Sequence, residues 1–588
     1  MYLKCNRRRK DGKDHNYWSI MENRRCAGGK VIQRPVLYLG EINDSQREAW
    51  IRSIEVFDED LGRQGQLTLF SSDREIPASV ADGIGVRLSE FVLKRPRQWG
   101  ACWLFTELWD QLGLRGFWRD KLGCSREGTN REHVLQVLVA NRLIDPGSEW
   151  HVHRQWYADT AMGDLLGEDD RIAAKDTLYR TLDLLVKHKR DLFDHLSAKW
   201  KDLFGIKYDV LLYDLTSTYF ESSPPEDPND PRRFGYSRDK RPDCVQVVIA
   251  LIVTPDGFPL AYEVLPGNTS DKTTLPAFLQ KIQDQYGKAR RVWIMDRGIP
   301  TEESLAKMRA CDPPVHYLVG TPKGRLSELE KDLAQQQWSA VREGVDVKLL
   351  PRDKELYVLA RSENRVCKER AMRRRQLKKL WKRLKELQGM EVKRDDLLIK
   401  LGQAKAESPA GWRLVEVEVP KDGRLVFSLR KKKLREVRRR EGRYLLRSNL
   451  CDRDPADLWQ LYMQLTRIEE AFRNIKGDLS IRPVYHQLPN RIEAHVFIAF
   501  LAYCLHVTLH YRLQLHAPGL TPRAVLEKLA TIQMLDAHFP TTDGRCLIFA
   551  RYTQPEKDHR MIIDLLGLQL PAQSPPRITQ DKKIIATS

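Results

Sequence analysis

The chain is long and strongly basic. Its 588 residues include 99 Lys and Arg against 80 Asp and Glu, which gives a formal net charge of +19 and a pI near 9.4. This length predicts several domains, and a hydrophobic fraction of 41% excludes global disorder. The charge indicates a polyanionic partner such as nucleic acid or an anionic surface, although a basic enzyme with an unrelated substrate stays open.

The ten cysteines are scattered along the sequence, with neither a C-x-x-C pair nor the Cys and His spacing of a zinc finger. This pattern favours a reduced intracellular protein with free thiols. Residues 1–18 contain no apolar run after their positive charges, which argues against a secretory signal.

In chain order, residues 1–95 contain short β-like runs at 30–40 and 65–72, and residues 96–205 turn to helical spacing of apolar residues. Three β-rich runs follow at 210–214, 244–254 and 258–267. The next expected elements are a helix at 275–287, a strand at 290–296, a helix at 302–311 and a strand at 316–320.

Three strands followed by α-β-α-β is the element order of the ribonuclease-H-like fold, in which the first and fourth strands are neighbours at the sheet centre. Asp214 ends the first expected strand and Asp296 ends the fourth, so we expect the two carboxylates to be close in space. The sequence predicts an α/β protein with a ribonuclease-H-like, retroviral-integrase-type catalytic core. The expected regions are a β-rich 1–95, a helical 96–205, the core at 206–324 and 445–515, an insertion at 325–444, and a tail at 516–588.

The insertion is expected to be mixed α/β and is very basic. The stretch from Arg365 to Lys385 contains eleven Lys and Arg, while Leu377, Leu380 and Leu384 fall on one helical face. Residues 412–430 resemble a hairpin. The basic face either follows DNA phosphates or is the solvated side of a helix that packs through its leucines.

The most apolar stretch runs from Ile492 to Leu513 and contains His495, His506 and His510. These polar interruptions favour a buried core helix over a membrane span. His506 and His510 have the spacing of a metal-binding pair, but the glutamate of H-E-x-x-H is absent, so core packing is favoured.

A third acidic residue, Glu469, lies on an expected helix at 454–476, where Asp454 is a suitable N-cap and Pro455 a suitable first residue. One such carboxylate is weak evidence, because a strand-end aspartate is more often a turn or a helix cap. Together, Asp214, Asp296 and Glu469 provide the oxygen ligands that two hard divalent cations bridging a phosphodiester require.

The surrounding motifs carry a family resemblance. They are YDLTSTYF from Tyr213, GYSRDKRPDCVQVVIALIV from Gly235, GFPLAYEVLPGNTSD from Gly257, MDRGI from Met295, and RIEEAFRNIKGDLSIRPVYH from Arg467. In this order they closely resemble the DDE transposases of bacterial insertion sequences, in the IS-four superfamily branch with a Y-R-E-K signature. The resemblance covers roughly Leu211 to Leu513.

This resemblance implies an enzyme that cleaves DNA at element ends and transfers the strands to a target by a two-metal mechanism. Asp214, Asp296 and Glu469 would hold two Mg²⁺ ions, for which Mn²⁺ could substitute, and Asp214 would contact both. Glu470 is a competing candidate, but Lys476 follows Glu469 at the family spacing.

The signature also calls for a tyrosine seven residues before the glutamate, an arginine four before it and a lysine seven after it. Tyr462 and Lys476 fit, whereas Leu465 occupies the arginine position. Arg467 or Arg473 could supply the missing guanidinium to a DNA phosphate. Alternatively, these basic residues form a solvated helix face.

The implied partners are DNA, as both terminal inverted repeats and target, and a second copy of the chain in a homodimer assembled on paired ends. Residues 96–205 would bind DNA ends, and no membrane is expected, which suits the nucleoid in a bacterial cytoplasm. Two alternatives stay open: a ribonuclease-H-like DNA nuclease without strand transfer, and a DNA-binding protein on an inactive nuclease fold. The intact acidic triad argues against the second.

Overall fold

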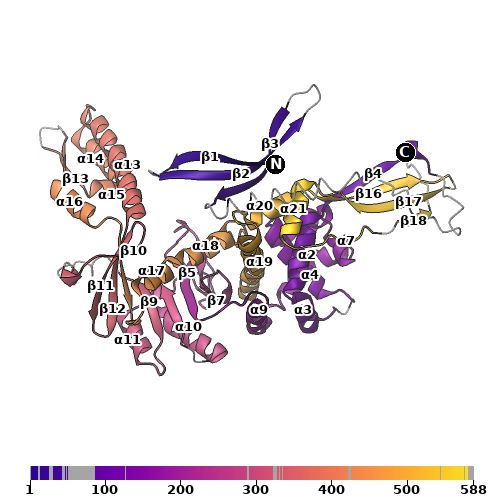
Figure 1. The fold of residues 1–588 in the computed structure, drawn as a ribbon, viewed down its shortest axis with the longest axis horizontal. Coiled ribbons are helices and arrows are strands. Elements are labelled where there is room, and N and C mark those ends of the chain that lie inside the picture. Colours follow the sequence, from indigo (N-terminus) through magenta and orange to yellow (C-terminus); the bar gives the residue numbers. More distant parts are fainter. Residues whose placement is uncertain are drawn as a thin grey trace.

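The protein is a mixed α/β structure built around one large sheet (Figure 1). The computed structural model describes residues 2–10, 13–25, 31–42, 47, 50, 86–125, 127–287, 290–321, 328–329, 332–333, 335–420, 425–542, 544–574 and 576–580. Within these residues a nine-stranded sheet is accompanied by sheets of two, three and four strands. The predicted mixed α/β class is therefore confirmed.

The N-terminal segment forms an antiparallel sheet of β1 (Tyr2–Lys10), β2 (Lys13–Arg25) and β3 (Val31–Glu41). The strand expected at 30–40 corresponds to β3. The strand expected at 65–72 lies outside the described residues.

The helical pattern predicted for residues 96–205 is confirmed. The longest helices of this region are α2 (Gly100–Gln111), α3 (Leu114–Leu122), α4 (Arg131–Ile144), α8 (Lys175–Leu182) and α9 (Lys189–Phe204), and the short α5 (Glu149–His151) follows α4. Helix α4 is buried along almost its whole length and packs against α19 (Pro489–His516). This contact joins the helical region to the later part of the chain.

The described residues between 517 and 580 contain more helices and strands than the expected tail. They form α20 (Pro522–Leu529), β16 (Gln533–Pro540), β17 (Arg545–Tyr552), α21 (Lys557–Leu565) and β18 (Arg577–Gln580). Strand β4 (Val92–Gln98) pairs with β16, so a strand that precedes the helical region shares the sheet at the right of Figure 1 with strands from the last part of the chain. The buried guanidinium of Arg97 fixes this sheet, because it bonds to Asp536 at 2.9 Å and to Asp164 at 2.8 Å.

The large sheet contains the five strands that the sequence predicted. They are β5 (Val210–Phe220), β6 (Val245–Val253), β7 (Pro259–Pro266), β8 (Val292–Met295) and β9 (His316–Gly320), with α10 (Asp271–Tyr286) and α11 (Glu302–Ala310) between strands. They lie in the order β9-β8-β5-β6-β7, with β9, β8 and β5 parallel and β6 antiparallel to β5. All nine residues of β6 are buried, as expected for a central Val- and Ile-rich strand covered on both faces.

Part of the expected insertion belongs to the same sheet. Strands β10 (Ser339–Arg342), β11 (Val345–Arg352), β12 (Glu355–Ser362) and β15 (Arg443–Ser448) continue it beyond β9. Strand β15 pairs with β9 in antiparallel orientation and covers an edge that would otherwise expose unpaired backbone groups. The boundary expected at residue 325 therefore does not coincide with an edge of the sheet.

The rest of the insertion stands away from the sheet at the left of Figure 1. It contains α13 (Glu363–Gln388), α14 (Arg394–Glu407), α15 (Pro409–Trp412), α16 (Lys431–Arg439), and the hairpin of β13 (Val415–Glu418) and β14 (Val426–Leu429). Leu380, Leu384 and Leu387 of α13 pack with Leu397 and Leu401 of α14 in a separate hydrophobic cluster. The expected hairpin and leucine face are thus present, and the leucines pack within the insertion itself.

The helix expected at 454–476 is two helices, α17 (Pro455–Met463) and α18 (Leu465–Lys476), which meet at Gln464. Asp454 is the N-cap of α17, as predicted, and its side chain accepts from the backbone N–H of Ala456. In the described residues one helix, α19, is long and apolar enough to cross a membrane, but 94% of its apolar window is buried. It is the expected core helix.

Candidate active site

Two aspartates follow the last paired residues of two neighbouring parallel strands. The register of β5 with β8 ends with Tyr213 opposite Met295, so Asp214 and Asp296 come next on the two strands. The expected neighbourhood of these residues is therefore present. Strand β5 continues to Phe220, and Asp214 consequently ends only the stretch paired with β8, not the strand as the sequence suggested.

Asp214, Asp296 and Glu469 line one pocket of about 460 Å³. The aspartates lie on the sheet, and Glu469 comes from α18, whose buried face of Ile468, Ala471, Phe472 and Ile475 holds the helix in place. The other lining residues are Arg297, Gly320, Thr321, Arg365, Lys368, Arg440, Arg443, Tyr444, Leu445, Tyr462, Met463, Leu465, Thr466 and Ile468. The three predicted acidic residues thus share one cavity.

The Asp214 carboxyl is costly to ionise. Burial raises its pKa to about 7, and the negative charge of Asp296 adds to this effect, although the hydrogen bond from the Leu215 N–H at 2.8 Å and the charge of Arg238 oppose it. The Asp296 carboxylate accepts a bond from the Arg297 N–H at 2.7 Å. A buried carboxyl beside another acidic group, in a pocket, is the environment that a bound cation would stabilise.

The two adjacent glutamates of α18 point to different cavities. Glu469 lines the pocket with the aspartates, whereas Glu470 pairs with Arg467 at 3.4 Å. Arg467 and Glu470 line a separate, smaller cavity with His506 and His510. Arg467, expected to bind DNA, therefore does not line the acidic pocket.

Tyr462 and Gly320 shape the floor of the pocket. A Cβ atom at Gly320 would lie 3.0 Å from the Tyr462 hydroxyl and 3.4 Å from Oδ1 of Asp296, so a glycine allows these two groups to approach the end of β9. Burial, with a smaller contribution from the charge of Asp296, raises the pKa of Tyr462 to about 12. The tyrosine is consequently a neutral hydroxyl donor near the acids.

A basic wall that the sequence did not reveal also lines this pocket. Arg365 and Lys368 of α13, together with Arg440 and Arg443 at the end of the insertion, line the same pocket. The guanidinium of Arg365 lies 3.7 Å from the ring centre of Tyr444 and bonds to Glu369 at 2.9 Å. Basic stretches in the insertion were a general signal for DNA, but nothing local distinguished these four positions.

The remaining predicted DNA-binding residues lie elsewhere on α18. Arg473 is exposed and does not line the pocket. Lys476 is largely buried, and its ammonium bonds to Asp239 at 2.8 Å, while Arg482 pairs with the same carboxylate. Burial lowers the pKa of Lys476. Lys476 therefore holds the 235–243 loop against α18.

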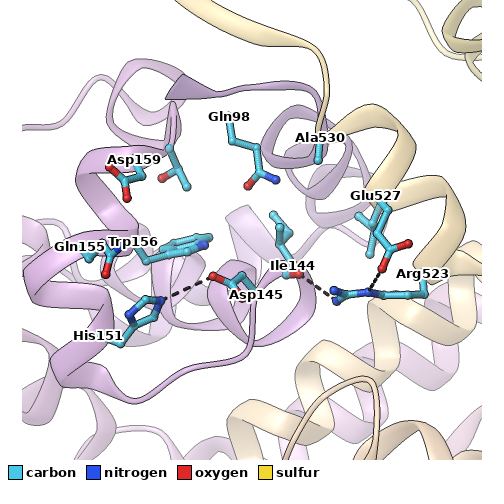
Figure 2. A pocket seen from close by; sticks show the side chains of 12 residues that line it. Gln98, Ile144, Asp145, His151, Gln155, Trp156, Asp159, Arg523, Glu527 and Ala530 are labelled. Atoms are coloured by element: carbon cyan, nitrogen blue, oxygen red, sulfur yellow. Dashed lines mark hydrogen bonds and ion pairs between the residues drawn. The ribbon is translucent and has the colours of Figure 1, made fainter. Parts of the chain in front are cut away.

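A second pocket, of about 350 Å³, lies where the helical region meets α20 (Figure 2). It contains none of the predicted site residues. In Figure 2, His151 faces Asp145 at 3.5 Å, and Arg523 bonds to the Ile144 carbonyl and to Glu527. Two acidic side chains of this pocket, Asp145 and Glu527, thus have a basic neighbour.

Two protein-family models match this chain. Residues 205–505, just over half of the chain, match the transposase DDE domain, and residues 3–55 match the N-terminal domain of IS1634 family transposases. A solved structure, the cryo-EM structure of a piggyBac transposase synaptic complex with hairpin DNA, is similar over 76% of this chain and 81% of that chain, with 10% identity and a TM-score of 0.33. No curated protein matches. The acidic pocket lies within the matched domain, and the chain belongs to the DDE transposases of insertion sequences.

Proposed function

We propose that this transposase cuts DNA at the ends of its element and joins the freed ends to a target, with Asp214, Asp296 and Glu469 as its catalytic acids. The observation that carries the proposal is their convergence in one pocket from β5, the end of β8 and α18. The strand order β9-β8-β5-β6-β7, with β6 antiparallel, supports a ribonuclease-H-like core.

The donor set fits divalent magnesium or manganese. Three carboxylates provide hard oxygen ligands, and a bound cation would favour the ionised form of Asp214, whose pKa is raised mainly by burial. Two Mg²⁺ ions held there would supply charge stabilisation for the attacking and departing oxygens of the phosphodiester. The separation of Glu470 into another cavity supports Glu469 as the third acid.

The basic wall would bind the DNA backbone. A DNA strand between the acids and the insertion would place the scissile phosphate by the carboxylates and its neighbouring phosphates by Arg365, Lys368, Arg440 and Arg443. These cations also offer a source for the guanidinium missing at Leu465, which lines the same pocket. Tyr462 would donate its hydroxyl to a phosphate oxygen.

Other parts of the chain serve assembly in this proposal. The helical region 96–205 binds element ends, and two copies pair those ends before cleavage. On α13, Arg374 is exposed and available to a partner's DNA, while Arg373 is bonded to the buried Glu441. Arg473 remains a candidate for a DNA contact on the exposed side of α18.

The decisive experiment is strand transfer with a labelled duplex carrying the end of the element, a supercoiled target plasmid, and Mg²⁺. We expect cleaved ends and joined products from the unchanged chain, and neither from Asp214→Asn, Asp296→Asn or Glu469→Gln, with end binding retained. Glu470→Gln is the matched control. Cleavage without joining would show a nuclease, and activity in all three acid variants would refute the site.

A further inference from the structure

Three buried side chains converge away from the acidic pocket. Glu149 comes from α5, His486 from the connection between α18 and α19, and His495 from α19. One potential ligand atom of each lies within 4.8 Å of those of the other two, and each residue is at most 8% exposed. A carboxylate and two imidazoles form a donor set that Zn²⁺ and neighbouring first-row cations accept.

Two of the three donors already have the spacing of ligands on one ion. Nε2 of His486 lies 3.1 Å from Oε1 of Glu149. Donors on a tetrahedral zinc ion, with bonds of about 2.0–2.2 Å, are separated by about 3.3 Å. An ion could therefore bind here with little movement of this pair.

The third donor has an unused nitrogen. Nε2 of His495 lies 3.0 Å from the carbonyl oxygen of Ile481, which can only accept, so Nε2 carries the hydrogen. Nδ1 is then a lone-pair donor, and it is buried without a hydrogen-bond partner among the described residues. A histidine whose other nitrogen donates to a carbonyl is oriented as metal-binding histidines are.

A buried arginine and an open pocket adjoin this group of three residues. Arg142 of α4 is buried and donates to the carbonyl of Ser480 at 3.1 Å, and its guanidinium is close enough to Glu149 and His495 for its positive charge to act on both. His486 also lines an open pocket of about 540 Å³ with Tyr179 and Arg491, through which water can reach a fourth coordination position.

We propose that Glu149, His486 and His495 bind one divalent cation of the zinc class. The site joins residues 337 positions apart in the sequence and would tie the helical region to the α18–α19 part of the core. It is separate from the magnesium site and does not depend on the proposed catalytic mechanism.

The test uses the full-length protein, stripped with chelator and titrated with Co²⁺ as a spectroscopic probe and with Zn²⁺ as competitor. With saturating Mg²⁺ present to fill the acidic pocket, we expect one equivalent of Co²⁺ per chain with visible absorption bands, displacement by Zn²⁺, and a rise in Tm on zinc addition. His495→Gln and Glu149→Gln should each weaken Co²⁺ binding by about 100-fold or more, because each removes a ligand.

Glu470→Gln is the matched control, since it removes a carboxylate from another cavity and should leave Co²⁺ binding unchanged. Circular dichroism of each variant separates loss of a ligand from loss of the fold. If the unchanged chain binds Co²⁺ no better than His495→Gln, the three residues form only a hydrogen-bonded network and the proposal is wrong. Loss of Co²⁺ binding in Glu470→Gln would also overturn it.

Discussion

Asp214→Asn should stabilise the metal-free protein, although it should abolish catalysis. The substitution keeps the size of the side chain and removes a carboxyl that the fold makes costly to ionise. Burial, followed by the charge of Asp296, raises the pKa of Asp214 to about 7 from the usual 3.8. The native chain therefore carries a destabilising charge whenever the pH exceeds that value and no cation is bound.

The size and direction of the effect follow from proton linkage. A carboxyl pKa raised from 3.8 to about 7 corresponds to about 4 kcal/mol, at about 1.36 kcal/mol per pH unit. The folded chain binds more protons than the unfolded chain between these two values, so its stability falls as the pH rises through this window. Asparagine should thus be neutral near pH 4 and stabilising by up to about 4 kcal/mol near pH 8.

Urea unfolding in EDTA at pH 5, 6, 7 and 8 measures this difference. Subtracting the unfolding free energy of the unchanged chain from that of Asp214→Asn at each pH cancels the contributions of the other titrating groups. Asp296→Asn should give a smaller gain, since it removes only the neighbouring charge. Added Mg²⁺ should stabilise the unchanged chain and not Asp214→Asn. An equal difference in unfolding free energy at every pH, or destabilisation at pH 8, would refute the electrostatic argument.

Three further predictions concern the pocket and the insertion. Glu469→Gln should lower the rate of plasmid cleavage about 1000-fold, because several kcal/mol of charge stabilisation are lost. Glu470→Gln should keep the original cleavage rate. The reverse result would make Glu470 the third acid. Gly320→Ala should crowd the pocket floor and lower cleavage about tenfold with DNA binding unchanged in gel shifts, and full activity would show that the close approach is unimportant. Arg373→Glu should destabilise the insertion by at least about 3 kcal/mol in thermal unfolding, because it breaks an ion pair with a buried carboxylate. Arg374→Glu changes an exposed residue, so it should lower the unfolding free energy by less than about 0.5 kcal/mol while it weakens assembly on paired ends. Equal unfolding free energies for these two variants would contradict the assignment.

The core elements could be predicted because their signals are local. Strand β6 is a continuous apolar run, α19 is apolar on all sides, and Asp454 with Pro455 marks the start of α17. The antiparallel pairing of β15 with β9 could not be predicted, since it joins strands more than 100 residues apart and depends on which edge of the sheet is open. The break at Gln464 likewise leaves no local sign, because this residue keeps a helical backbone and neither glycine nor an internal proline marks it.

In the candidate site too, some residues could be predicted from local sequence and others could not. Motif order located Asp214, Asp296 and Glu469, and the sheet register explains why the two aspartates meet. The charges that face them come from the insertion, where the sequence offers many equivalent arginines and lysines. Only the tertiary structure distinguishes the role of Arg365, which lines the pocket, from that of Arg373, which forms an ion pair with a buried glutamate. The apolar Leu465 then has a physical explanation in the proposed mechanism: with cations supplied across the pocket by the insertion, α18 does not need its own arginine at that turn.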